Sequence, residues 1–172
     1  PLPPGRIYNS NRFTLNGLAQ VFGCEVRDYG IVPDSLEATR AVLRRAAAEC
    51  DVIVTSGGVS VGEADFVKPA VEAEGSLLMW KIAMKPGRPL AFGSVGQAAF
   101  IGLPGNPVSS MVCGRIFLVP AVERMLGLPG EAPATTTGRL GGDLEPNGPR
   151  AHYMRARAEP APDGWRCTPF PR

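Results

Sequence analysis

The stretch from Asp51 to Asp65, which reads DVIVTSGGVSVGEAD, limits the possible folds of this chain more than any other. It begins as a buried strand over residues 51–54 and continues into a loop that contains Gly57 and Gly58. A strand that leads through a glycine-rich loop into a helix is how α/β proteins hold an anion, because the backbone approaches closely and offers free N–H groups. The alternative is an ordinary strand–helix connection, but such connections need only about 2–6 residues.

The composition excludes several other classes of protein. With 172 residues, 44% of them hydrophobic, the chain is long enough for one domain with a core and a small appendage. A net charge of +2 favours neither nucleic acid nor a membrane as a partner. Four widely spaced cysteines and one histidine argue against a zinc site or a disulfide scaffold and favour free thiols. With neither a signal peptide nor a bilayer-spanning run in the sequence, we expect a cytoplasmic protein.

Two helices and a strand are predicted ahead of the glycine-rich loop. Asn9–Asn11 offer capping side chains to a helix in which Phe13 begins an apolar series at helical spacing. Cys24–Val32 has the pattern of a buried strand, and an amphipathic helix is predicted over Ser35–Cys50. Asp34 is suited to cap that helix, but it also follows the end of a strand, where α/β sheets bind their ligands. Both roles of Asp34 remain open from these residues alone.

A basic turn follows the next predicted helix, Phe66–Glu74. Leu77–Trp80 predicts a strand that continues into KIAMKPGRP at residues 81–89, and Leu90–Gly93 returns as a short strand. A solvated turn is the ordinary explanation for its cations. The apolar residues around the two lysines argue instead that their ammonium groups emerge at a rim or a cleft.

A second strand–loop–helix unit is predicted over residues 98–126. Ala98–Ile101 predicts a buried strand, GLPGNP at 102–107 a rigid loop, and Val108–Leu126 a long helix. Asn106 suits the N-cap and Pro107 the first helical turn. The helix start could receive an anion, although good capping explains the same residues equally well.

The character of the chain changes after Gly127. Residues 128–134 are rich in proline and glycine, and residues 135–172 contain short alternating stretches. Gly141-Gly142, Asn147-Gly148 and Asp163-Gly164 are hairpin signals. Because so few residues cannot bury a core by themselves, we expect a truncated β appendage there.

Three of these stretches together resemble a known family. They are SGGVSVGEAD at residues 56–65, the KxxxKPGRP segment at 81–89, and GLPGNPVS at 102–109. In this order and at this spacing they resemble the molybdopterin molybdotransferases of the MoeA and gephyrin E-domain type, closely over residues 4–126 and weakly over 135–172. The resemblance implies a three-layer α/β/α sandwich with a mostly parallel sheet, the MogA-like molybdopterin-binding fold, over residues 1–127. A linker at 128–134 and a partial C-terminal β domain at 135–172 would follow.

The resemblance also implies an activity in molybdenum cofactor biosynthesis. The family inserts molybdate into adenylylated molybdopterin, with Mg²⁺ assistance, and releases AMP. Asp34 and Asp65 would be catalytic and would hold the magnesium, which suits carboxylates combined with substrate phosphate. Lys81 and Lys85 would face the oxyanion. The other residues expected to bind substrate are Ser56, Gly57, Gly58, Ser60, Gly62, Glu63, Pro86, Pro104, Gly105, Asn106 and Ser109.

The sequence also departs from the family pattern. The family carries a strand with a Ser/Thr-Gly-Asp-Glu turn before its Pro-Gly-Arg-Ile-Tyr-Asn segment, and nothing ahead of Pro1 supplies it. We therefore expect the first strand and the dimerising amino-terminal region to be missing, which leaves the activity of the isolated fragment open. The full-length parent is expected to form a homodimer and to contact other cofactor-biosynthesis proteins.

Two other functions are compatible with the same fold. One is molybdopterin adenylyltransferase, whose members usually continue the Gly-Gly pair with Thr-Gly, whereas this chain continues with Val59-Ser60. The other is a non-catalytic binding module, in the way that the gephyrin E-domain holds receptor tails.

Overall fold

The computed structural model describes residues 3, 5, 7–59, 65–129 and 134–170. Its helices are α1 (Ser10–Val21), α2 (Leu36–Glu49), α3 (Val67–Glu74), α4 (Pro107–Cys113) and α5 (Val119–Met125), and the π-helical turn η1 (Gly114–Leu118) joins the last two. Its strands are β1 (Val52–Ser56), β2 (Gly75–Lys81), β3 (Met84–Lys85), β4 (Pro89–Val95), β5 (Ala98–Leu103), β6 (Gly138–Leu140), β7 (Ala151–His152), β8 (Ala156–Ala161) and β9 (Gly164–Pro169).

The central sheet has the strand order β1-β5-β4-β2. β1 pairs with β5 in parallel, from Val52 opposite Ala99 to Ser56 opposite Leu103, whereas β4 runs antiparallel to both β5 and β2. The α/β fold class is confirmed, but the sheet is mixed rather than mostly parallel, because the returning strand β4 inserts between β2 and β5. β1, β5 and β2 therefore run in the same direction, and their carboxyl ends share one edge of the sheet.

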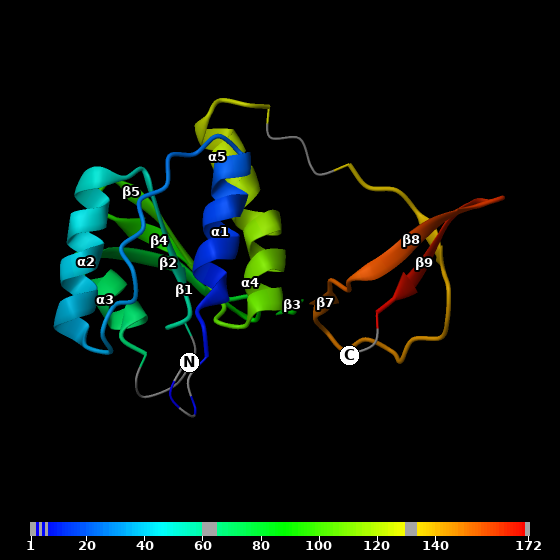
Figure 1. Cartoon of the computed structure of the whole chain (residues 1–172), viewed down its shortest axis with the longest axis horizontal. Coiled ribbons are helices and arrows are strands. Elements are labelled where there is room, and N and C mark those ends of the chain that lie inside the picture. The colour runs from blue at the N-terminus through cyan, green and yellow to red at the C-terminus, as the bar shows by residue number, and fades with distance from the viewer. Residues whose placement is uncertain (1–2, 4, 6, 60–64, 130–133, 171–172) are drawn as a thin grey trace.

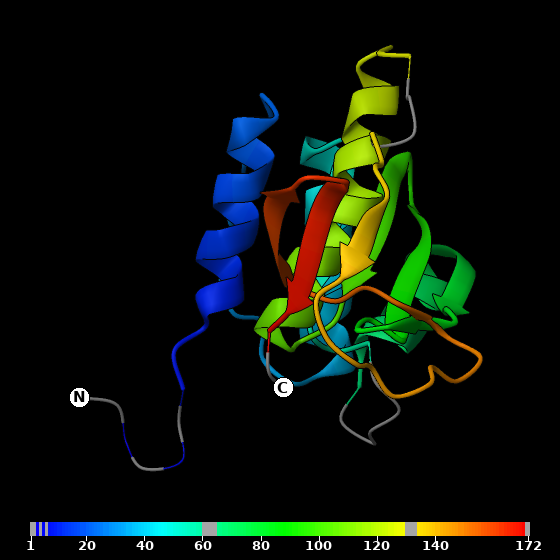
Figure 2. The same ribbon diagram turned by 90° about the vertical axis from the view of Figure 1, so that its right-hand side faces the viewer.

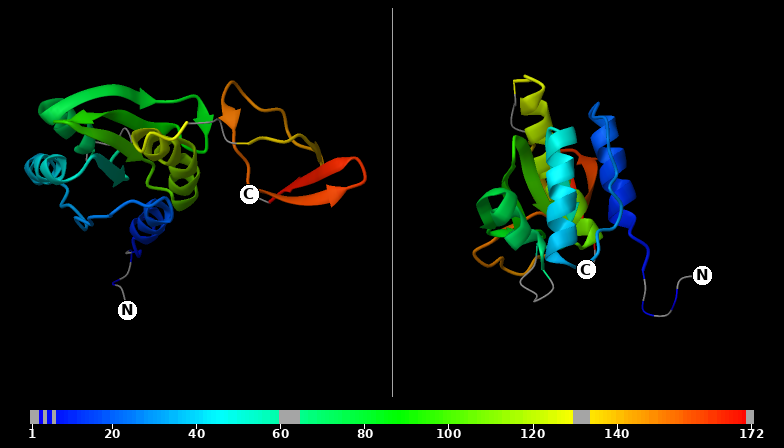
Figure 3. Two further views of the ribbon diagram at one scale, coloured as in Figure 1. Left: turned by 90° about the horizontal axis from the view of Figure 1, so that it is seen from above. Right: turned by 90° about the vertical axis from the view of Figure 1, so that its left-hand side faces the viewer.

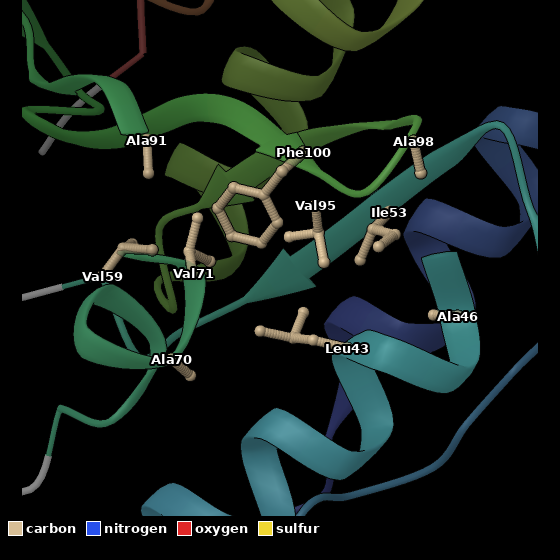
Figure 4. Close-up of a cluster of buried hydrophobic side chains, with 10 residues drawn as sticks. All are labelled: Leu43, Ala46, Ile53, Val59, Ala70, Val71, Ala91, Val95, Ala98 and Phe100. Atoms are coloured by element: carbon tan, nitrogen blue, oxygen red, sulfur yellow. The ribbon is translucent and has the colours of Figure 1, made fainter. Parts of the chain in front are cut away.

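Helices cover both faces of this sheet, which gives three layers (Figure 1). On one face, Leu43 of α2 and Val71 of α3 pack with Phe100 of β5 (Figure 4). On the other face, Ile101 and Leu103 of β5 pack against Cys113 and against the residues of η1 and α5. Because neighbouring residues of a strand point to opposite faces, Phe100 and Ile101 belong to the two different cores.

The long helix predicted over 108–126 is confirmed, with a π-helical turn inside it. Pro120 has no N–H to donate, and its ring would clash with the carbonyl four residues earlier in a regular α-helix. The wider turn η1 lies immediately before this proline and removes that conflict. Gly114 in the same turn lets α1 approach, since a Cβ there would lie 3.0 Å from a Leu18 methyl carbon.

The strand predicted over Cys24–Val32 is wrong, because these residues form an extended connection between α1 and α2. A strand needs a neighbour for its hydrogen bonds. β1, an outer strand of the central sheet, pairs only with β5 among the described strands. Side chains hold the connection instead. Asp28 pairs with Arg12 of α1, and the Tyr29 hydroxyl donates to Glu49 of α2 over 2.8 Å.

Two details of the predicted helices are corrected as well. The N-cap of α2 is Ser35 rather than Asp34, and its hydroxyl accepts the Ala38 N–H over 3.2 Å. Asp34 is exposed one residue before that cap. Phe13 is 72% exposed instead of lying on the inner face of α1, because α1 covers the sheet with its other side, which carries Leu15.

The β appendage, residues 134–170, forms the three-stranded sheet β6-β9-β8, which faces the viewer in Figure 2. The predicted turn at Asp163-Gly164 joins the antiparallel pair β8 and β9, whereas β6 pairs with β9 in parallel. The hairpins predicted at Gly141-Gly142 and Asn147-Gly148 do not form among the described residues. Seen from above, the appendage extends away from the α/β part on the side of β3 (Figure 3). The short parallel pair of β3 with β7 joins the two.

Candidate functional site

The candidate site lies at the edge of the central sheet where β1, β5 and β2 end. The loop after β1 carries Gly57 and Gly58, the loop after β5 carries Gly105 and Asn106, and the Lys81–Pro89 segment follows β2. All three motifs that resemble the molybdotransferases therefore reach the same edge. In α/β proteins, ligands bind outside the carboxyl ends of such strands.

The first two loops approach each other through their glycines. The Gly57 N–H donates to the Leu103 carbonyl over 3.0 Å, which extends the β1–β5 ladder by one residue. A Cβ on Gly105 would lie 3.4 Å from the Gly57 Cα. Gly57 and Gly58 have φ values of +86° and +68°, a region that favours glycine. These positions thus give the loop its tight course beside the neighbouring loop.

A buried asparagine on α1 joins the same two loops. Asn11 is only 6% exposed, and its Nδ2 donates to the Ser56 hydroxyl over 2.7 Å and to the Gly105 carbonyl over 2.8 Å. The Ser56 hydroxyl donates in turn to the Pro104 carbonyl over 3.5 Å. Asn11 was expected to serve as a capping residue, but Asn9 is the cap of α1.

The start of α4, next to the second loop, is capped by a side chain and carries a hydroxyl. The predicted N-cap is confirmed: the Asn106 side chain accepts the Ser109 N–H over 3.2 Å, and the Ser109 hydroxyl lies 3.4 Å from the same oxygen. Pro107 occupies the first helical turn. Pro104 is buried, so the loop is anchored at its start and exposed at Gly105 and Asn106.

The basic turn packs onto the same helix. A Cβ on Gly87 would collide with Cys113 Sγ and with the Met84 side chain, so only glycine allows the turn to lie this close to α4. Burial raises the pKa of the Cys113 thiol to about 11. Cys113 lies one helical turn after Ser109 on the same face of α4. The turn that carries Lys85 and Pro86 is therefore held against Cys113, the last residue of α4.

Cations surround a hollow next to this turn. It has a volume of about 450 Å³, and its lining includes Lys81 and Arg88 from the α/β part and Arg150 from the β appendage. Backbone hydrogen bonds bring Arg150 there: the Ala151 N–H donates to Ala83 over 2.9 Å, and the Tyr153 N–H donates to Lys85 over 2.7 Å.

The two predicted metal ligands occupy different surroundings. Asp65 lies beside the glycine loop, since a Cβ on Gly58 would be 3.8 Å from Asp65 Oδ1. Asp34 is exposed at the start of α2. Within the described parts of the chain, no three His, Cys, Asp or Glu side chains gather closely enough to hold a metal ion. The described residues thus supply separate carboxylates rather than a preformed metal cage.

Some predicted positions lie outside the described residues, namely Ser60, Gly62 and Glu63. Conversely, sequence reasoning did not include Asn11, Arg88 or Arg150 among the site residues. Arg88 stands within the recognised motif and could have been found there. Asn11 carried only a helix-capping signal, and Arg150 follows a turn without any pattern of its own.

Comparisons with known proteins identify the family and the fold of this chain. The family model described as "Probable molybdopterin binding domain" matches residues 2–124. A molybdopterin molybdenumtransferase from Haemophilus influenzae is 46% identical over 127 residues, which cover 74% of this chain and 31% of that protein. One from a Nostoc species is 33% identical over 159 residues, 90% of this chain and 36% of that protein. The crystal structure of a molybdopterin biosynthesis MoeA protein from Pyrococcus horikosii superposes with a TM-score of 0.82 at 28% identity, covering all of this chain and 41% of that one.

The fold is therefore a three-layer α/β domain in which three loops meet at one edge of the sheet. This chain belongs to the molybdopterin-binding domain family. It spans about a third of the length of the curated relatives named above. None of the helices that the structure describes is long and apolar enough to cross a membrane.

Proposed function

We propose that the protein containing this chain is a molybdopterin molybdotransferase and that this domain binds its pterin substrate. In this proposal it inserts molybdate into adenylylated molybdopterin and releases AMP. The observation that carries the proposal is that three separate motifs, from the ends of β1, β5 and β2, reach one edge of the sheet next to a cation-lined hollow. The relatives named as molybdopterin molybdenumtransferases share the chain segment that holds all three motifs.

The roles follow from the chemistry of each loop. The exposed backbone at Gly58 and Gly105, with the half-buried Gly57 between them, would accept the substrate phosphate and pterin, because glycine leaves room for close approach. Ser109 would add its hydroxyl at the helix start, beside the Asn106 side chain that accepts the Ser109 N–H.

The oxyanion would bind where the cations gather. Lys81, Arg88 and Arg150 line one hollow, Lys85 lies in the same basic turn as Lys81 and Arg88, and molybdate is a dianion. Charge-assisted hydrogen bonds from such groups are about twice as strong as neutral ones. Arg150 would contribute a guanidinium, whose planar donor pair suits two oxygens of one anion.

Magnesium is part of the proposal through Asp34 and Asp65. Mg²⁺ usually takes one or two protein carboxylates and completes its shell with water and substrate phosphate, so separate carboxylates are compatible with it. When bound, it would neutralise phosphate charge. Asp34 is available for this role because Ser35, and not Asp34, caps α2.

The remaining expectations belong to the same proposal. They are the division of the chain at 127 and 134, a homodimeric parent, contacts with other cofactor-biosynthesis proteins, and a cytoplasmic location. The segment with two lysines and the names of the relatives favour the transferase over the adenylyltransferase of the same fold.

The test is an assay of molybdate-dependent AMP release by the protein that contains this chain. Purified protein is given adenylylated molybdopterin, Mg²⁺ and molybdate, and AMP release is measured. Lys85→Ala and Asp65→Asn are expected to lower molybdate-dependent AMP release at least tenfold, since each removes a charge from the site. Arg124→Ala, an exposed cation at the end of α5, is the matched control. Unchanged release in the first two variants would refute the site, and AMP release that ignores molybdate would refute the activity.

A further inference from the structure

We propose that Asn11 is a positioning residue that fixes the two substrate-binding loops relative to each other. The inference rests on the proposed function for the identity of the ligand. It concerns a residue that touches the loops from behind rather than the substrate. Its side chain, from α1, reaches residues 45 and 94 positions further along the chain.

The local structure of α1 does not account for an asparagine at position 11. Asn9 caps α1, with its side chain accepting the Arg12 N–H over 3.2 Å. Asn11 already lies inside the helix, where asparagine is a poor helix former because its amide competes with the backbone. It is also the one buried residue of α1, a helix that the structure describes over its whole length. A buried amide at this position therefore has a role outside its own helix.

The two loops use both N–H bonds of the Asn11 amide. An asparagine Nδ2 has two hydrogens, and here one goes to Ser56 Oγ at 2.7 Å and the other to the Gly105 carbonyl at 2.8 Å. Asp at this position would have the same shape but no N–H to donate. Leu would leave the Gly105 carbonyl without this buried donor.

Contacts between the two loops alone do little to fix their spacing beyond the end of the β1–β5 ladder. The β1–β5 ladder ends at Ser56 and Leu103, with one further bond from the Gly57 N–H. Beyond that bond the facing residues are glycines, which have the largest conformational freedom of any residue. The single side chain of Asn11 donates both to Ser56, the last residue of β1, and to Gly105 in the loop after β5. The spacing between Gly57 and Gly105, where the substrate would bind, is thereby set by α1.

The experiment compares Asn11→Ala and Asn11→Asp with Asn9→Ala in the protein that contains this chain. Asn9→Ala weakens the same helix without touching the loops, so it is the matched control for loss of α1 stability. All variants are measured at a temperature where thermal unfolding shows each to be more than about 99% folded. The readouts are the Kd for molybdopterin, KM and kcat for AMP release, and amide hydrogen exchange of Gly57.

Both Asn11 variants are expected to raise the Kd and KM for the pterin substrate about tenfold, a size usual for loss of an orienting contact, with kcat changed less than KM. Gly57 exchange is expected to accelerate about tenfold in the same variants. Asn9→Ala should leave the Kd, the KM and Gly57 exchange within about twofold of wild type. Equal effects of Asn9→Ala and Asn11→Ala, or wild-type Kd and exchange in Asn11→Asp, would overturn the proposal.

The exchange measurement keeps this inference separate from the proposed function. If the wild-type protein binds no molybdopterin, the proposed function fails, but Gly57 exchange still reports whether Asn11 holds the loops. If molybdopterin binds and Gly57 exchange is unchanged by Asn11→Ala, the positioning role fails while the proposed function stands.

Discussion

Gly57 and Gly105 face each other across the ends of two neighbouring parallel strands, with the Cα of Gly57 only 3.4 Å from where a Cβ of Gly105 would stand. This contact joins two motifs that lie almost fifty residues apart in the sequence. Gly57 needs glycine for its backbone φ of +86°, whereas a Cβ on Gly105 would make an ordinary van der Waals contact with Gly57. Under the proposed function, a side chain on either residue would occupy space that the substrate approaches.

Gly57→Ala is therefore expected to damage binding more than folding. An alanine at φ +86° is strained by roughly 1–2 kcal/mol. Gly127→Ala provides a matched control, because Gly127 has a φ of +75° and open space around it, far from the candidate site. Urea denaturation should give similar destabilisation for both, whereas only Gly57→Ala should weaken molybdopterin binding. Equal binding by both variants would contradict the role assigned to this loop.

Phe100 and Phe13 should contribute very differently to the free energy of unfolding, because only Phe100 lies in a core. Phe100 is completely buried between the sheet and the helices α2 and α3, so Phe100→Ala should destabilise the fold by about 3–5 kcal/mol. Phe13 is 72% exposed, and Phe13→Ala should change the free energy of unfolding by no more than about 0.5 kcal/mol. Chemical denaturation measures both. A loss above about 2 kcal/mol for Phe13→Ala would mean that α1 packs through the face that the sequence predicted.

The four cysteines should differ in reactivity. Cys113 is completely buried with a pKa near 11, so at pH 8 only about one thiol in a thousand is ionised, and the thiolate is the reactive form. Cys24, Cys50 and Cys167 are half-buried. Iodoacetamide followed by peptide mass spectrometry should label these three in the native protein, and Cys113 only after denaturation. Fast native labelling of Cys113 would show that the basic turn does not cover α4 as described.

Lowering the pH should destabilise the folded state, because it protonates Asp28 in the connection between α1 and α2. The Gly30 N–H, followed by the Arg12 guanidinium, lowers the pKa of Asp28 in the folded state. Asp28 therefore binds a proton less readily in the folded state than in the unfolded state, where its pKa is about 3.9. The contribution of Asp28 to stability is complete above about pH 5 and is lost as the pH falls through 3.9 and below.

Asp28→Asn tests this assignment. The variant should be less stable than wild type at pH 7, and the difference should shrink between about pH 5 and pH 3. Asp143→Asn, an exposed aspartate of the β appendage, serves as the control. A difference that stays constant over this pH range would assign the effect of Asp28 to packing rather than to its charge.

Local signals predicted much of the fold. The caps at Asn9 and Asn106, the helix over α3 and the turn at Asp163-Gly164 depend on residues within a few positions of one another, and all were found. The strand predicted over Cys24–Val32 failed because its apolar alternation says nothing about whether a neighbouring strand is there to pair with it.

The sequence by itself determined the three motifs, the order of most helices and strands, and the family to which they point. Only the tertiary structure decided that β4 enters the sheet antiparallel, that Ser35 takes the cap from Asp34, and that Arg150 of the appendage joins the cations of the α/β part. It also decided the role of Asn11, whose partners lie 45 and 94 residues away. The physical reason is the range of the interactions: caps and turns form between near neighbours, whereas strand pairing and a shared binding edge exist only once distant segments have packed together.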